Sequence, residues 1–130
     1  MLDSGSSAAE YWWNQALECL AAAESEYEAD RLSFCVNRLY YAAFYSVTSI
    51  LLERGMHFRK HSGVRSAFHR ELVKTGIVGK ESGIPYDQLF ADRQEGDYMP
   101  FAVFSKDEVS ELLGRTRKFL SDIRKLQGSR

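Results

Sequence analysis

Arg38 is the first residue of this sequence whose position suggests a chemical role. It is the one charged residue between Arg31 and Glu53, in an apolar run that also holds Tyr41. A buried charge without a partner is costly, so we expect Arg38 either to pair with a carboxylate of a neighbouring helix or to line a cleft. In a cleft it would bind phosphate, with the ring of Tyr41 available for stacking.

His61 is the second candidate, because it lies where we expect a helix to begin. At such a position a His can act as an acid, a base or a phosphate contact. His57 and His61 also have the spacing of metal ligands on one helix face, but the HExxH pattern is absent and no carboxylate or thiol cluster accompanies them. We therefore predict no metal site and no cofactor.

The third candidate is the segment RQEGDY, from Arg93 to Tyr98. On a helix, Arg93 and Asp97 are four residues apart and can form an ion pair. One interpretation is a surface pair that finishes the helix. The alternative is that Arg93, Asp97 and the phenol of Tyr98 face the same cleft as Arg38. The sequence has no Gly-rich phosphate loop, no nucleophile elbow and no carboxylate cluster for magnesium.

Charge is distributed unevenly along the chain. Residues 1–30 carry seven acidic side chains and no Lys or Arg, whereas residues 54–74 carry six Lys or Arg, three His and a single Glu. Two solvated helix faces of opposite sign would explain this. The alternative is a basic site for phosphate or RNA and an acidic surface for a partner. The net charge of −1 provides no overall field towards nucleic acid or membrane.

The elements that must position these residues are helices. The run 32–52 has no Gly or Pro and is apolar on every side, which is typical of a core helix or a membrane span. Arg38 and Asn37 argue against a span. Other helices are predicted by their periodicity at 8–29, 63–74, from residue 85 to before Pro100, and from residue 106 onwards.

Several residues mark the predicted ends of these helices. Asp30 and Ser62 are expected to cap the second and third helices, and Pro85 to be the first residue of the fourth. Residues 76–84, with three Gly, are expected to form a loop. Ser105 and Glu108 form a capping box before the last helix.

The sequence thus predicts an all-α protein, an antiparallel up-and-down bundle of four main helices with a shorter fifth. Its 130 residues suit one domain, which we place at 8–126, with flexible ends at 1–7 and 127–130. Cys19 and Cys35 are expected to be buried free thiols, because the predicted helix hairpin places them at different heights. No signal peptide is recognisable, so we expect a cytoplasmic protein.

Three segments resemble the HEPN family (higher eukaryotes and prokaryotes nucleotide-binding). They are NRLYYAAFY at 37–45, KHSGV at 60–64, and Arg93 to Asp97-Tyr98, in this order along nearly the whole chain. The resemblance is strongest to the small bacterial and archaeal single-domain branch. It implies a helical bundle that forms a homodimer and is paired with a minimal nucleotidyltransferase, commonly as toxin and antitoxin.

The resemblance also implies metal-independent ribonuclease chemistry in many members, with an Arg followed after four to six residues by a His. Counted from Arg38 and from Arg93, the position of that His is taken by Tyr45 and by Tyr98. A phenol with a pKa near 10 is a poor general base at pH 7. We therefore predict that the chain lacks this Arg–His motif.

Three functions follow as hypotheses. In the first, the protein is a HEPN-type module that binds a nucleotide or RNA through Arg38, Tyr41, His61, Arg93, Asp97 and Tyr98, and is the partner of a minimal nucleotidyltransferase. In the second it is an active ribonuclease toxin, with Arg93 or Arg38 stabilising charge and His61 transferring the proton. In the third it is a dimerisation domain without a ligand.

Overall fold

The structure is a computed structural model that describes the backbone of residues 4–98 and 104–128. Side chains are described for 7–81, 83–91 and 104–128. Within these residues all regular elements are helical, which confirms the all-α prediction: α1 (Ser4–Glu28), α2 (Leu32–Glu53), α3 (His61–Phe68), the π-helical η1 (His69–Val73), α4 (Lys80–Tyr98) and α5 (Lys106–Leu126). The ends predicted to be flexible lie partly outside this range, at residues 1–3 and 129–130.

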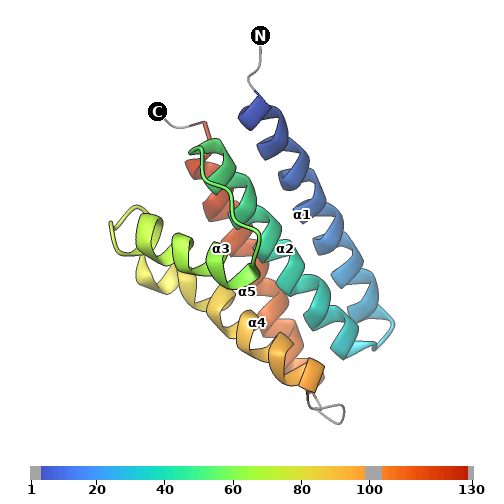
Figure 1. Ribbon diagram of the computed structural model, residues 1–130. Coiled ribbons are helices and arrows are strands. Elements are labelled where there is room, and N and C mark those ends of the chain that lie inside the picture. The colour runs from blue at the N-terminus through green and yellow to red at the C-terminus, as the bar shows by residue number, and fades with distance from the viewer. Residues whose placement is uncertain (1–3, 99–103, 129–130) are drawn as a thin grey trace.

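The predicted central helix is α2. It contacts α1, α3, α4 and α5, and in Figure 1 it runs through the middle of the bundle with α1 beside it. Its side chains form much of the core, including Leu39, Tyr40 and Ile50, which are fully buried. One strip of α2 stays outside the core, since Phe34 is 64% exposed. None of the described helices is long and apolar enough to span a membrane.

The turn between α1 and α2 differs from the prediction. Asp30 does not cap α2; the N-cap position is Arg31, which makes no side-chain capping bond. Asp30 instead takes a left-handed conformation with φ of 60°, which Asp tolerates better than most residues. Its carboxylate accepts a hydrogen bond from Lys106 Nζ at 2.5 Å and so joins this turn to the start of α5.

The third helix begins at His61, two residues earlier than predicted, and Ser62 is not its cap. The N-cap position is Lys60, again without a side-chain capping bond. The packing of His61 against α2 accounts for the early start, because that contact fixes the chain before Ser62. From His69 to Val73 the helix continues as a π-helix, which the 3.6-residue periodicity did not predict.

The fourth helix also begins early, and the predicted loop at 76–84 is shorter than expected. Pro85 is inside α4, not at its start, so one backbone bond to the carbonyl of Glu81 is lost. Gly83 is helical and buried: a Cβ there would lie 3.3 Å from the ring of Phe68. The glycine thus permits close packing of two helices and does not mark a loop.

The last helix agrees with its prediction. The hydroxyl of Ser105 accepts a hydrogen bond from the backbone N–H of Glu108, and the Glu108 carboxylate accepts one from the backbone N–H of Ser105. Its inner face is buried, and includes Val109, Thr116 and Ile123. Cys19 and Cys35 are free thiols, as predicted, but only Cys35 is buried, whereas Cys19 was expected to be buried and is partly exposed.

Candidate functional site

His61 is held by the central helix. Its Nδ1 lies 2.9 Å from the hydroxyl of Tyr40, and its ring stacks on Phe44 with 4.0 Å between ring centroids. Tyr41 meets the imidazole edge-on, at 5.8 Å and 88°. The structure therefore brings together two of the predicted site residues, His61 and Tyr41, and adds Tyr40 and Phe44, which were not predicted as site residues.

Arg38 does not have the buried position that we expected. It is exposed, because the helices that cover α2 leave this side of it open. Arg38 lies near Cys19 of α1. Burial raises the pKa of the Cys19 thiol and outweighs the opposing effect of the Arg38 charge. Because the Arg38 guanidinium stays in contact with water, it does not carry the desolvation cost from which we expected it to pair or to line a cleft.

The remaining predicted residues, Arg93, Asp97 and Tyr98, are in the last turns of α4. Their backbone is helical, as expected, so Arg93 and Asp97 have the i, i+4 spacing. Their side chains lie outside the described residues. Whether they face Arg38 thus stays a prediction.

A hollow of about 280 Å³ adjoins His61, between α1, α2 and the segment before α3. Aromatic rings form much of its wall, among them Phe44 and Tyr45 from α2 and Trp12 from α1, with 5.0 Å between the rings of Trp12 and Tyr45. Burial raises the pKa of the Tyr45 phenol. The complete lining is Trp12, Phe44, Tyr45, Thr48, Leu51, Met56, His57, Phe58, Arg59, His61 and Val64. We call this site the aromatic hollow.

A second cluster was missed by the sequence analysis. One oxygen of the Asp87 carboxylate, Oδ1, lies 2.8 Å from Arg65 Nε and 2.7 Å from His69 Nε2. The guanidinium of Arg65 also lies over the ring of Phe90, 4.8 Å from its centroid. The sequence did indicate part of this cluster, since Arg65 and His69 are four residues apart on one helix. It gave no indication of Asp87, which is 22 and 18 residues further along the chain.

The search for an Arg–His motif also missed one stretch. The prediction that the chain lacks the motif is wrong at this stretch, because six residues separate Arg54 from His61, a spacing within the range of four to six. Arg54 is the exposed C-cap of α2. Arg59, and not Arg54, lines the aromatic hollow with His61.

Within the described ranges 7–81, 83–91 and 104–128, no three His, Cys, Asp or Glu side chains converge as metal ligands would. The aromatic hollow and the Asp87 cluster therefore offer a ligand aromatic stacking, hydrogen bonding and positively charged side chains. Such groups suit a ligand with a planar ring and an anionic part.

Comparison with known proteins decides the family. The family sequence model of the HEPN domain matches residues 9–126, which include the aromatic hollow and the Asp87 cluster. The chain belongs to the HEPN family. This HEPN domain is 45% identical to a Thermotoga maritima protein named "UPF0332 protein", over 90% of this chain and 89% of that protein.

Two further relatives come from Methanocaldococcus jannaschii. This HEPN domain is 32% identical to a protein named "Putative toxin MJ0142", over 85% of this chain and 76% of that protein. It is 27% identical to one named "Putative toxin MJ0605", over 85% of this chain and 81% of that protein. Both archaeal relatives are thus named as "Putative toxin".

Proposed function

We propose that this HEPN domain binds a nucleotide or RNA and is the toxin-like member of a pair with a minimal nucleotidyltransferase, acting in the cytoplasm as a homodimer. Membership of the HEPN family and the names of the two archaeal relatives support the toxin-like role. The nucleotidyltransferase and the homodimer rest on the family resemblance. The binding role rests on the site.

The observation that carries the binding role is the aromatic hollow beside His61. Its volume of about 280 Å³ is near the lower end of small-molecule sites, which suits a single nucleobase. Trp12, Tyr45 and Phe44 offer ring faces for stacking, and base–aromatic stacking contributes roughly 1–3 kcal/mol per base. Arg59 and His57, both exposed, line the same hollow and would contact phosphate.

The residues predicted from sequence have places in this proposal. Arg38, Tyr41 and Tyr45 follow each other at three and four residues along α2, so they lie on one side of it. Because Tyr45 lines the hollow, Arg38 and Tyr41 would contact the part of the ligand outside it. Arg93, Asp97 and Tyr98 are proposed as further contacts from α4. If the protein cleaves RNA, His61 and Arg93 are the proposed catalytic pair.

Tryptophan fluorescence tests the proposal. Trp13 is 7% exposed and lies under the guanidinium of Arg124, away from the hollow. A Trp13→Phe variant leaves Trp12 as the sole reporter, and we expect a saturable change on titration with ATP, GTP or a short RNA. Adding Tyr45→Ala should raise Kd roughly 5- to 150-fold, the equivalent of one lost stacking contact.

Two controls make the titration specific. Phe34→Ala removes an exposed aromatic side chain of α2 that does not line the hollow, and should leave Kd unchanged. In the protein that retains Trp13, Trp12→Phe should abolish the fluorescence change on titration. If no nucleotide and no RNA gives a saturable change, the binding role is wrong. The RNA is then run on a gel with EDTA present throughout, since cleavage would support the ribonuclease alternative.

A further inference from the structure

A second hollow, rich in basic side chains, lies on the outer side of α3 and η1. It has a volume of about 630 Å³ and reaches the start of α4 at Lys80. Five of its described lining residues are basic and none is acidic; the lining is Arg65, Ser66, His69, Arg70, Val73, Lys74 and Lys80. We call it the basic groove.

Two acidic residues beside the basic groove hold its cations without neutralising them. Asp87 accepts hydrogen bonds from Arg65 and His69, and Glu71 accepts one from Arg70 at 3.1 Å. Counting Arg65, Arg70, Lys74 and Lys80 against Asp87 and Glu71 leaves an excess of two positive charges with His69 neutral. A guanidinium has five N–H donors, so an Arg bound to a carboxylate at Nε can still donate to phosphate.

A continuous series of contacts joins the basic groove to the aromatic hollow. This series lies beneath the surface: the fully buried Tyr40 bonds His61 and lies 6.1 Å from the ring of Phe90, and the guanidinium of Arg65 lies over that ring. His61, Arg65 and His69 follow one another every four residues, hence along one side of the helix.

The distance along α3 and η1 determines which ligand could contact both the aromatic hollow and the basic groove. From His61 to Lys74 the helix rises by about 20 Å at 1.5 Å per residue. A mononucleotide in the aromatic hollow would not reach Lys74. A nucleic-acid strand with one base in the aromatic hollow and its following phosphates along the basic groove would reach Lys74. Stacking needs an unpaired base, so the strand must be single.

We propose that the ligand is single-stranded RNA whose sugar–phosphate backbone follows α3 and η1, from the aromatic hollow to the basic groove. The proposal deepens the proposed function and rests on it for the position of the base. The π-helical turn supports it: η1 supplies His69, Arg70 and Val73 to the groove, and π turns inside helices are frequent at functional sites.

Affinity as a function of ligand length tests this. Kd is measured for AMP, a ten-nucleotide oligo(A), and the same decamer in a duplex, by Trp12 fluorescence in the Trp13→Phe protein and by anisotropy of labelled decamers. We expect the single-stranded decamer to bind at least tenfold more tightly than AMP and than the duplex. Lys74→Ala with Lys80→Ala should weaken decamer binding about tenfold, flatten its salt dependence and leave AMP binding unchanged.

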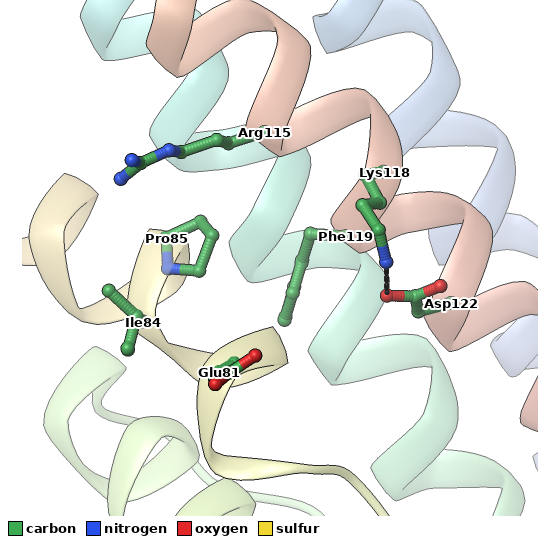
Figure 2. Close-up of a pocket in the computed structure, with 7 residues that line it drawn as sticks. All are labelled: Glu81, Ile84, Pro85, Arg115, Lys118, Phe119 and Asp122. Atoms are coloured by element: carbon green, nitrogen blue, oxygen red, sulfur yellow. Dashed lines mark hydrogen bonds and ion pairs between the residues drawn. The ribbon is translucent and has the colours of Figure 1, made fainter.

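The hollow between α4 and α5 provides the matched control. Figure 2 shows Arg115 and Lys118 there together with Glu81 and Asp122, so this hollow has balanced charge. Arg115 and Lys118 are engaged by Glu111 at 2.6 Å and by Asp122 at 3.1 Å. Arg115→Ala with Lys118→Ala removes the same two charges from the protein. It should leave the affinity for the decamer within about twofold.

Each outcome separates this proposal from the function on which it rests. If AMP binds but the decamer binds no more tightly, the basic groove has no role and the binding function stands. If the decamer binds through Lys74 and Lys80 while AMP does not bind, the groove is supported and the aromatic hollow is not. Equal affinity for the duplex, or equal loss in the control variant, overturns the single-stranded path. Absence of all binding overturns both proposals.

Discussion

At the scale of single residues, the two thiols have different surroundings although both are free. Cys35 is fully buried in α2, and burial raises its pKa to about 11. Cys19 is only partly buried, against Arg38, and its pKa is raised less strongly by the same cause. The thiolate is the reactive form, so both exposure and pKa favour reaction at Cys19.

We predict that iodoacetamide at pH 8 modifies Cys19 slowly and leaves Cys35 unmodified in the folded protein. With a pKa of about 11, roughly one Cys35 thiol in a thousand is ionised at pH 8. Raising the pH towards 9 should speed the reaction at Cys19, because more thiolate forms. Peptide mass spectrometry gives the modified position. A Cys19→Ser variant that still reacts without urea would contradict this assignment.

The same scale shows which site residues a sequence can predict. Tyr41 and His61 were predicted from their types and from the motifs around them, and the structure brings them together. Tyr40 and Asp87 were not, because their roles depend on partners 21 and 18 to 22 residues away that only packing brings near. Arg38 was placed wrongly, since a single charged residue in an apolar helix does not show which side of that helix remains uncovered.

At the scale of helices, the start of α5 is the best-defined end in the chain. Ser105 and Glu108 each satisfy a backbone N–H of the other. Asp107 and Glu108 also put negative charge on the first turn, where the helix dipole favours it. Lys106 then joins this turn to α1 by donating to the Tyr27 carbonyl and to Asp30.

We predict that Ser105→Ala lowers the free energy of unfolding by about 1 kcal/mol, because the N–H of Glu108 loses its acceptor. The melting temperature should fall by about 3–5 °C. Ser110→Ala is the control, since Ser110 is exposed in the same helix and beyond its first turn. Equal melting temperatures for the two variants would mean that the capping box adds no stability.

Helix positions followed from hydrophobic periodicity, whereas several helix ends did not. The early start of α4 depends on Gly83 packing against Phe68, which the sequence presents as a flexible residue. The turn before α2 depends on Asp30 binding Lys106, 76 residues away. Each of these errors comes from a contact between helices that overrides a local preference.

At the scale of the whole molecule, α3, α4 and α5 meet at Phe68. Its ring is fully buried and lies 5.5 Å from Tyr86 of α4 and 5.7 Å from Phe119 of α5. This junction supports the outer helices from inside, on the side opposite the basic groove. The prediction of one helical bundle succeeded because apolar positions along each helix supply such a core.

We predict that Phe68→Ala lowers the free energy of unfolding by about 3–5 kcal/mol, a large part of the roughly 5–15 kcal/mol of an ordinary domain. Urea denaturation followed by circular dichroism measures it. Phe34→Ala removes the same group from an exposed position and should change stability by less than about 0.5 kcal/mol. A small effect at Phe68 would show that these helices do not depend on a shared core.

The π-helical turn has a consequence for how the chain length can vary. A π turn holds one residue more than an α turn, so deleting one residue between His69 and Val73 would restore ordinary α geometry. The helix before it and the chain after Lys74 could then keep their places. Homologues shorter by one residue in this segment would retain the bundle but present a differently spaced row of cations. Insertion and deletion at a single codon would thus alter the groove without altering the fold.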